Sequence, residues 1–275
     1  MLLDEDVTDE DKDMLRRTVA SASDNSALYF KTVYGEFQDA HVERGIPRTA
    51  YYRLLIPWLL PQYDRVIYSD VDIIFKGNGV GALYEQFDME GLYVAGAARA
   101  SYMRQTGILH RHIVSLGLDP EKYINDGFIL INSFLQRKDN LLEAFRRHST
   151  RVLKLMDQDV INIVCRGKIG YFGEQYNATP LSVATGDVDR YHVLHFVGNK
   201  PWNMFCPGWG EWWEAYRASA VFDKKYCEST IDMQSQKMKT YVKNEELLGS
   251  SFVLRNMRRV LWRLKELPEK LRRRM

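Results

Sequence analysis

DRVIYSDVDIIF, residues 64–75, is the stretch of sequence that decides the fold. Its apolar, β-branched run from Val66 to Tyr68 stops at Asp70 and resumes at Ile73. Such a run is typical of a buried strand in an α/β protein, where both faces of the sheet are covered. Ligands of open α/β sheets bind outside the carboxyl ends of strands, so this strand is predicted to deliver two carboxylates to a binding site.

The two carboxylates belong to Asp70 and Asp72, on either side of Val71. Residues two apart point the same way from a strand, so both side chains can face one cation. Hard oxygen ligands suit Mg²⁺ or Mn²⁺, and either metal can neutralise charge on a leaving diphosphate. An Asp-x-Asp motif also occurs on solvated loops, and its position directly after an apolar strand is what favours a metal site here.

Apolar and amphipathic segments alternate along the rest of the chain. Strands are predicted within residues 27–34, 92–98, 126–134, 169–177 and 193–203. Helices are predicted at residues 4–22, 47–60, 102–117, 137–155, from 157 onward and at 209–219. This alternation predicts an α/β fold with a mostly parallel sheet flanked by helices. We expect that domain to occupy residues 1–223, followed by a polar linker over 224–250 and a separate tail over 251–275.

His195 ends the apolar run VLHF and is followed closely by Gly198 and Lys200. Imidazole is acceptable to Mn²⁺, a glycine lets backbone approach a phosphate, and a lysine supplies a positive charge. Two alternatives stay open. A histidine beside apolar residues is often a core side chain, and GNKPW is also compatible with a surface turn.

Two further polar motifs flank predicted elements. Asn125-Asp126-Gly127 precedes the FILIN strand, and Asp157-Gln158-Asp159 stands at a helix start. Either motif could offer amide and carboxylate groups to the hydroxyls of a sugar. The alternatives are a turn for the first motif and, for the second, an N-cap with acids favoured by the helix dipole.

The order of these motifs resembles the family 8 glycosyltransferases, which include bacterial lipopolysaccharide galactosyl- and glucosyltransferases and glycogenin. The matching segments are TAYYRLLIPWLLP, DRVIYSDVDIIF, YINDGFILIN, LMDQDVIN and HFVGNKPW, from about residue 48 to residue 203. Five ordered segments are more specific than any one of them. The resemblance implies a GT-A fold, a UDP-sugar donor, Mn²⁺, a glycan or lipid-linked acceptor, and retention of the anomeric configuration.

The resemblance also implies roles, carried over by position. The implied metal ligands are Asp70, Asp72 and His195. The residues implied to contact the donor are Arg53, Asp70, Val71, Asp72, Asn125, Gly198 and Lys200. The residues implied to be catalytic are Asp126, which would line the sugar pocket with Asn125, and Asp157 and Gln158, which would lie beside the reacting carbon. Metal and lysine would stabilise the leaving UDP, and amide and carboxylate groups would hold the sugar. Retention by a carboxylate nucleophile or by same-face attack stays open, and Gln158 is a poor nucleophile.

Two departures from the family pattern matter. The family begins with an apolar strand and a loop that grips the uridine, whereas this chain opens at what reads as the following helix. The loop before Lys200 is one residue shorter than the commoner Gly-x-x-Lys-Pro-Trp. The first departure leaves open a remnant that keeps the fold and cannot hold uridine. A metal-dependent phosphatase with an Asp-x-Asp-x-Thr/Val motif is disfavoured, because Ile74 occupies the last position.

Charge is unevenly placed along the chain. The formal net charge is +2, yet residues 251–275 hold nine Lys or Arg against two Glu. Five apolar residues of this tail follow a 4-3-4-3 spacing that places them on one helical face: Val253, Met257, Val260, Leu264 and Leu267. A basic amphipathic helix is typical of an anchor on anionic lipid. The alternative is a helix packed on the body, and the mildly acidic body argues against nucleic acid as a partner.

Cysteine usage and hydropathy indicate the compartment. The three cysteines show no metal-binding spacing, which fits a reducing cytoplasm. The acidic N-terminus lacks the apolar run of a signal peptide, and no apolar stretch reaches the length of about 18 residues that spans a membrane. We therefore expect a cytoplasmic protein peripheral to the inner face of the cell membrane.

Overall fold

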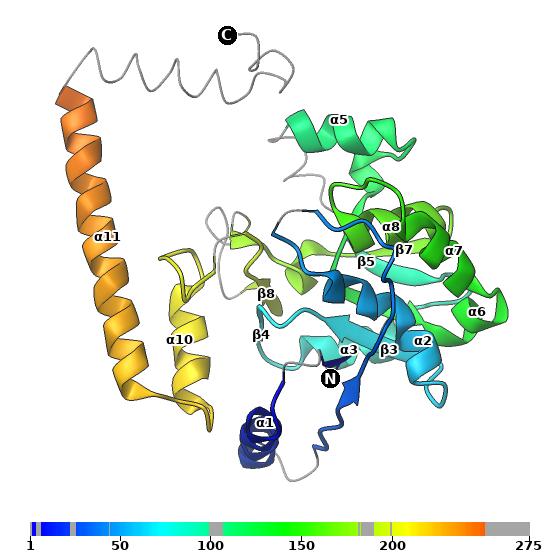
Figure 1. Cartoon of the computed structure of the whole chain (residues 1–275), viewed down its shortest axis with the longest axis horizontal. Coiled ribbons are helices and arrows are strands. Elements are labelled where there is room, and N and C mark those ends of the chain that lie inside the picture. The colour runs from blue at the N-terminus through cyan, green and yellow to red at the C-terminus, as the bar shows by residue number, and fades with distance from the viewer. Residues whose placement is uncertain are drawn as a thin grey trace. The chain divides into compact units, whose positions relative to one another are not determined.

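The computed structural model describes residues 2–3, 7–22, 26–43, 45–98, 107–180, 182, 190–198 and 200–250. The chain divides into two compact units. The first comprises residues 1–201 and 206–222 and contains every described strand (Figure 1). The second comprises Trp202–Phe205 and the chain from Asp223 onward.

The described strands of the first unit form three sheets. Their bounds are β1 Leu2–Leu3, β2 Lys31–Thr32, β3 Arg65–Ser69, β4 Ile73–Phe75, β5 Val94–Ala98, β6 Ile124–Asn132, β7 Ile169–Phe172 and β8 Val193–His195. The main sheet has the order β3-β6-β5-β7, β4 pairs with β8, and β1 pairs with β2. β6 is antiparallel to β3 and β5, whereas β5 is parallel to β7. The sheet is therefore mixed: β3, β5 and β7 share one direction, as predicted, but β6 runs against them.

The reversed direction of β6 determines which residues meet at one edge of the main sheet. β3 and β7 end at the edge where β6 begins. The register pairs Ser69 with Phe128, so Asp70, just past the end of β3, lies beside Gly127. The backbone N–H of Asp70 donates to the carbonyl of Gly127 at 2.7 Å. Residues 125–127, for which a turn was the alternative, thus belong to a strand and open onto the same edge as Asp70.

Helices cover both faces of the main sheet. Those of the first unit are α1 Asp9–Ala22, η1 Arg48–Leu55, α2 Ile56–Leu59, α3 Gly79–Gln86, α5 Gly107–Ser115, η2 Pro120–Lys122, α6 Ser133–Lys138, α7 Leu141–Ser149, α8 Met156–Val164, η3 Glu174–Tyr176 and α10 Trp209–Ala218. The predicted helix at 47–60 is a 3₁₀ helix, η1, that continues into the short α2. The α/β class predicted from the alternating pattern is confirmed.

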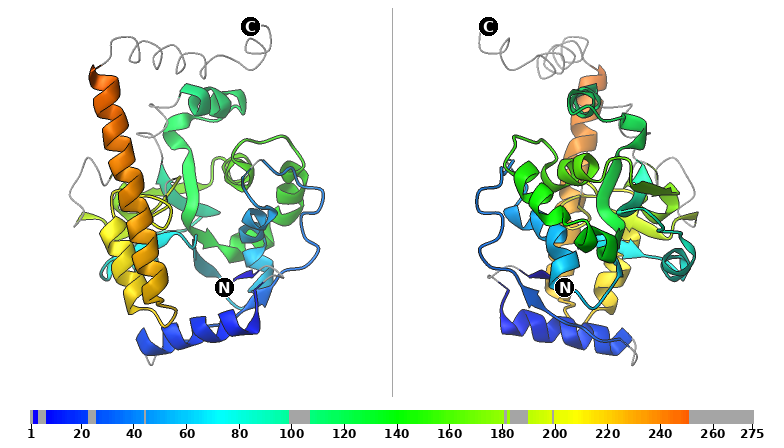
Figure 2. Two further views of the ribbon diagram at one scale, coloured as in Figure 1. Left: turned by 60° about the vertical axis from the view of Figure 1, so that its left-hand side comes forward. Right: turned by 90° about the vertical axis from the view of Figure 1, so that its right-hand side faces the viewer.

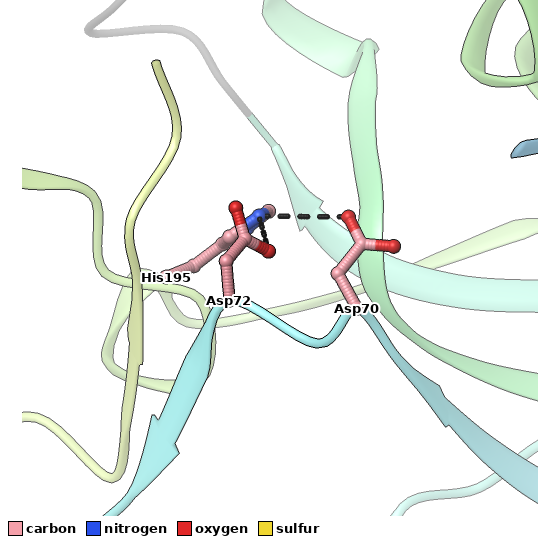
Figure 3. A group of neighbouring side chains, drawn as sticks. All are labelled: Asp70, Asp72 and His195. Atoms are coloured by element: carbon pink, nitrogen blue, oxygen red, sulfur yellow. Dashed lines mark ion pairs between the residues drawn. The ribbon is translucent and has the colours of Figure 1, made fainter. Parts of the chain in front are cut away.

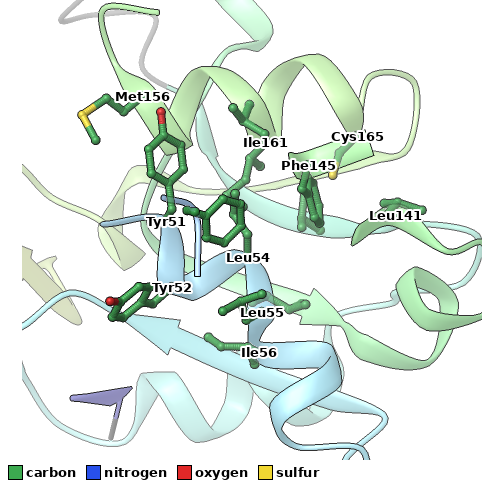
Figure 4. Close-up of a cluster of buried hydrophobic side chains, with 14 of the residues drawn as sticks. Tyr51, Tyr52, Leu54, Leu55, Ile56, Leu141, Phe145, Met156, Ile161 and Cys165 are labelled. Atoms are coloured by element: carbon green, nitrogen blue, oxygen red, sulfur yellow. The ribbon is translucent and has the colours of Figure 1, made fainter. Parts of the chain in front are cut away.

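Side-chain alternation along β6 supplies both cores. Ile129 and Ile131 join a cluster that η1, α7 and α8 cover, and Figure 4 shows Tyr51 of η1 and Ile161 of α8 within it. Phe128 and Leu130 face the opposite way, into a cluster with residues of α3, β4 and β8. Full burial of each such side chain stabilises the fold by about 1.5–3 kcal/mol. β6 is thus fixed from both sides, and with it residues 125–127.

Residues 224–250, expected to be a linker, form one long helix, α11 (Lys224–Ser250), drawn without interruption in both views of Figure 2. The segment is thus helical, and its role as a linker stays a prediction. The segment contains no proline, and its only glycine is Gly249, so nothing in it breaks a helix. Its apolar residues do not gather on one stripe, which is why periodicity gave no helical signal. The domain boundaries themselves stay predictions.

The tail predicted to be amphipathic, residues 251–275, lies outside the described residues. Among the helices that are described, none combines the length and the apolar character that a membrane crossing needs.

Candidate active site

The metal-site prediction centres on the short connection between β3 and β4. Asp70 and Asp72 lie in this connection, which leaves the main sheet and enters the β4–β8 pair. In that pair Ile73 is the register partner of His195, and the N–H of Phe196 donates to the carbonyl of Asp72 at 3.0 Å. Strand pairing therefore places His195 next to Asp72, although 123 positions separate them in the sequence.

The three predicted ligands converge (Figure 3). One ligand atom from each of Asp70, Asp72 and His195 lies within 4.8 Å of the others. Nε2 of His195 is 3.6 Å from Oδ2 of Asp70 and 3.4 Å from Oδ1 of Asp72. Asp72 and His195 are buried, and the Asp70 side chain is 25% exposed. Two carboxylates and an imidazole form a donor set that Mn²⁺ accepts, with Asp70 on the solvent side.

Because Gly127 has no side chain, Asp70 and His195 have room to come together beside it. A Cβ atom at position 127 would collide with Cε1 of His195 and would lie 2.6 Å from Oδ2 of Asp70. Any side chain there would push apart two of the three predicted ligands. Gly127 falls within the strand predicted at residues 126–134, and a close backbone approach is what a glycine inside a strand often signals, but no role at the metal site was predicted for it.

Lys200 reaches the same cluster from the loop after β8. Its ammonium contacts Oδ2 of Asp72 and donates to the carbonyl of Phe196 at 2.9 Å. Burial alone would raise the pKa of the Asp72 carboxyl, but its contacts with His195 and with the Lys200 ammonium outweigh burial and lower the pKa to about 2. Gly198 adopts φ +82°, a conformation that favours glycine. The loop thus turns at Gly198 and brings a positive charge to the predicted metal site.

Arg53 organises the acidic side of the site. Its guanidinium is buried and pairs with three carboxylates: Nη2 with Asp70 at 2.8 Å, Nη1 with Asp126 at 3.2 Å and Nε with Asp157 at 2.8 Å. The same group lies over the ring of Tyr68, 4.4 Å from its centroid. In the structure Arg53 holds three acids from three elements together, and its predicted contact with a donor stays a prediction.

Arg53 and the buried carboxylates around it shift one another's pKa values. Burial alone would lower the pKa of the Arg53 guanidinium, but the carboxylates of Asp126 and Asp157 hold that pKa well above its ordinary value. Burial raises the pKa of Asp157 well above its ordinary value; Arg53 opposes this shift and Asp126 adds to it. Acidic side chains outnumber basic ones at this edge of the sheet, which suits a divalent cation.

Amide side chains lie directly behind the metal ligands. The Asn125 amide donates to Oε1 of Gln158 at 2.6 Å, so two residues implied to touch the sugar contact each other. A residue that the sequence analysis did not single out, Asn177, stands between Asn125 and His195. It follows η3 in a segment expected to be strand and loop, where no sequence motif marks this asparagine as functional.

Comparison with known proteins identifies the family and the fold of this chain. The sequence model described as "Glycosyl transferase family 8" matches residues 1–206, and the chain belongs to that family. A galactosyltransferase, LgtC, solved with donor and acceptor sugar analogues, superposes with a TM-score of 0.65 at 19% identity, covering 80% of this chain and 84% of that one. The GT-A-like fold predicted from the sequence is thereby confirmed.

Two curated relatives share sequence as well. The lipopolysaccharide 1,2-glucosyltransferase of Escherichia coli K12 is 26% identical over 179 residues, which cover 58% of this chain and 50% of the enzyme. The lipopolysaccharide 1,3-galactosyltransferase of Salmonella typhimurium LT2 is 26% identical over 190 residues, which cover 62% of this chain and 52% of the enzyme. The chain therefore spans about half the length of these two relatives.

Proposed function

We propose that the chain transfers a hexosyl group from a UDP-sugar to a glycan or glycolipid acceptor, with retention of configuration and with a divalent metal. The convergence of Asp70, Asp72 and His195 beside the Asn125–Gln158 pair carries this proposal. On this fold, a metal ligand set beside amide groups suits a diphosphate bound next to a sugar. The relatives named above act on lipopolysaccharide with glucosyl or galactosyl groups, which supports a surface glycan as the product.

We assign the residues around the diphosphate the following roles. Asp70, Asp72 and His195 would hold the metal, which when bound withdraws charge from the diphosphate as its bond to the sugar breaks. Mn²⁺ is the metal we propose, with Mg²⁺ as the substitute. Lys200, already at the edge of this cluster, would neutralise a diphosphate oxygen, and Gly198 would let backbone approach it.

On the sugar side, Asn125, Asp126 and Gln158 would bind and orient the hexose. The acceptor oxygen bonds to the anomeric carbon as the UDP oxygen leaves, and the acceptor proton passes to the departing diphosphate or to a nearby carboxylate. Asp157 would stay in place as a partner of Arg53, since the pair is separated by 2.8 Å. Arg53 would then act by positioning Asp70, Asp126 and Asp157 rather than by reacting.

A donor panel tests the proposal. We expect the chain to release UDP from one of UDP-glucose, UDP-galactose or UDP-N-acetylglucosamine in the presence of Mn²⁺, to lose this activity with EDTA, and to regain it when Mn²⁺ is restored. Proton NMR of the product would report the anomeric configuration. Silence of a well-folded sample towards every donor would favour a remnant. Phosphate release from simple esters without a UDP-sugar would favour a phosphatase.

The basic tail supports a place at the membrane. We propose that residues 251–275 hold the protein against anionic lipid at the cytoplasmic face, where a lipid-linked acceptor would be found, at about 1 kcal/mol per cation near the surface. The full chain is expected to sediment with vesicles that contain phosphatidylglycerol and not with neutral phosphatidylcholine vesicles. A chain ending at residue 250 should stay in the supernatant with both. Equal sedimentation of the two chains would contradict an anchor in the tail.

A further inference from the structure

The start of β6 departs from regular pairing with β5. The register that pairs Gly96 with Ile129 shifts before the pair of Ala98 with Ile124. Residues 125–128 therefore lie between these two pairs, opposite a single residue of β5. Irregularities of this kind release strand residues from their usual partners and often occur beside active sites. The stretch contains two residues of the proposed sugar site, so pairing with β5 does not set their positions.

Side chains from outside the sheet bond the backbone of this stretch. The carbonyl of Asp126 accepts from Nη1 of Arg53 at 2.9 Å. Both backbone groups of Ile124 bond the side chain of Asn162 on α8: the N–H donates to Oδ1 at 2.9 Å, and the carbonyl accepts from Nδ2 at 3.0 Å. Ile124 is fully buried, and buried backbone groups need partners. The Asn162 amide therefore supplies the donor and the acceptor that a neighbouring strand would normally supply.

The same amide also bonds its own helix. Nδ2 of Asn162 donates to the carbonyl of Gln158, one turn earlier in α8, at 2.8 Å. An amide NH₂ has two hydrogens, and here both meet carbonyls, which only accept. The amide oxygen meets an N–H, which only donates. Reversing the amide would break all of these bonds, so the side chain has one orientation, and only 2% of Asn162 is exposed.

Asn162 thus joins the two elements that carry the proposed sugar site. It bonds the residue directly before Asn125 on β6 and the backbone of Gln158 on α8, and the side chains of Asn125 and Gln158 meet at 2.6 Å. We propose that Asn162 is a positioning residue: it sets the separation of β6 and α8 and thereby the place at which Asn125 and Gln158 hold the sugar. The inference rests on the proposed function for its effect on the reaction.

Loss of the Asn162 amide should affect turnover and not metal binding. Displacement of a positioned group by about 1 Å can cost about 10²-fold in rate, so Asn162→Ala is expected to lower kcat for UDP release by about that factor. The Kd for Mn²⁺, followed by electron paramagnetic resonance, should stay unchanged. The reason is that the described bonds of Asn162 go to Ile124 and Gln158 and not to the predicted metal ligands.

Asn132→Ala is the matched control. Asn132 lies at the other end of β6, and its amide also bonds two backbone groups, the N–H of Leu135 at 3.0 Å and the carbonyl of Met89 at 3.2 Å. This variant should lower the melting temperature and keep wild-type kcat. A merely structural role for Asn162 predicts the same result for Asn162→Ala, namely a lower melting temperature with unchanged kcat of the folded protein. That result would overturn the inference.

Amide hydrogen exchange, followed by NMR, tests the contact independently of activity. The Ile124 amide should exchange slowly in the wild type and faster in Asn162→Ala. It should also exchange faster in the milder Asn162→Ser, which serves if the alanine variant does not fold. The Ile129 amide, in the regular part of β6, should stay protected in every variant. Fast exchange at Ile124 in the wild type, or unchanged exchange in the variants, would refute the contact.

The two proposals fail in different ways. Absence of UDP release from the wild type with every donor would count against the proposed function. Exchange at Ile124 and Asn125 would then still decide whether Asn162 holds β6 in place. Normal UDP release from the wild type together with wild-type kcat in Asn162→Ala would leave the proposed function intact and remove the positioning role.

Discussion

Asp72→Asn is expected to lower Mn²⁺-dependent UDP release by about 10³-fold, equivalent to about 4 kcal/mol of lost transition-state stabilisation. The substitution keeps the shape of the side chain and removes the charge that faces His195 Nε2 at 3.4 Å and Lys200. The metal would lose one of two anionic ligands, and Lys200 would lose its acidic partner. The activity of each variant is measured as initial UDP release at saturating donor.

Asp64→Asn is the matched control for this variant. Asp64 is 76% exposed and pairs with Arg137 at the surface, and such exposed pairs contribute about 0–1 kcal/mol. The control should keep wild-type activity. If Asp72→Asn also kept it, the assignment of Asp72 as a metal ligand would be wrong.

The effect of Asp72→Asn on folding stability should depend on pH. The Asp72 pKa of about 2 lies below the ordinary value of about 4. The ionised carboxylate therefore stabilises the fold above about pH 4, and this contribution is lost as the pH falls towards 2. Asp72→Asn should lower stability at pH 7 and converge with the wild type in acid, as followed by thermal melting.

Arg53→Met is expected to cost about 3–5 kcal/mol of unfolding free energy, the usual penalty for removing one partner of a buried ion pair. The guanidinium is the shared partner of Asp70, Asp126 and Asp157, and the last two of these are buried. Methionine fills much of the volume and leaves the three acids facing one another. Urea denaturation at pH 7.5 measures the loss.

A surface arginine provides the comparison. Arg146 pairs with Glu36 where both side chains are substantially exposed, so Arg146→Met should cost no more than about 1 kcal/mol. The deficit of Arg53→Met should also shrink between pH 8 and pH 5, because the pKa of Asp157 is already raised and protonation relieves the unpaired acids. A deficit equal to that of Arg146→Met would show that Arg53 does not hold the acids together.

Local patterns were enough to predict the strands that carry the site. The apolar runs before Asp70 and around His195 predicted β3 and β8, and the ordered motifs predicted the family. Strand direction was harder, because a strand buried on both faces, such as β6, reads the same in either orientation. Local sequence also left a turn open as the alternative for residues 125–127, which lie in β6. Whether residues 125–127 are buried depends on the neighbouring strands β3 and β5, which the local sequence does not show.

The least predictable features were long-range polar contacts. Arg53 and Asp157 are 104 positions apart, and only the folded chain shows that one guanidinium serves three acids. Asn177 carries no motif at all, since its role depends on the rings and amides around it. Gly127 was visible as a glycine in a strand, but the atoms that exclude a side chain there come from β8 and from the end of β3. Each of these roles is set by tertiary contacts rather than by local propensity.

Val71, in the connection between β3 and β4, is 82% exposed, whereas its neighbours Asp70 and Asp72 form ion pairs with Arg53 and Lys200. The three natural cysteines are buried, and burial raises the pKa of the Cys165 and Cys206 thiols, so little thiolate is available for reaction. Val71→Cys would therefore accept a thiol-directed fluorophore or spin label without removal of any native cysteine. A probe attached there would sit between two predicted metal ligands and report on whatever binds beside them.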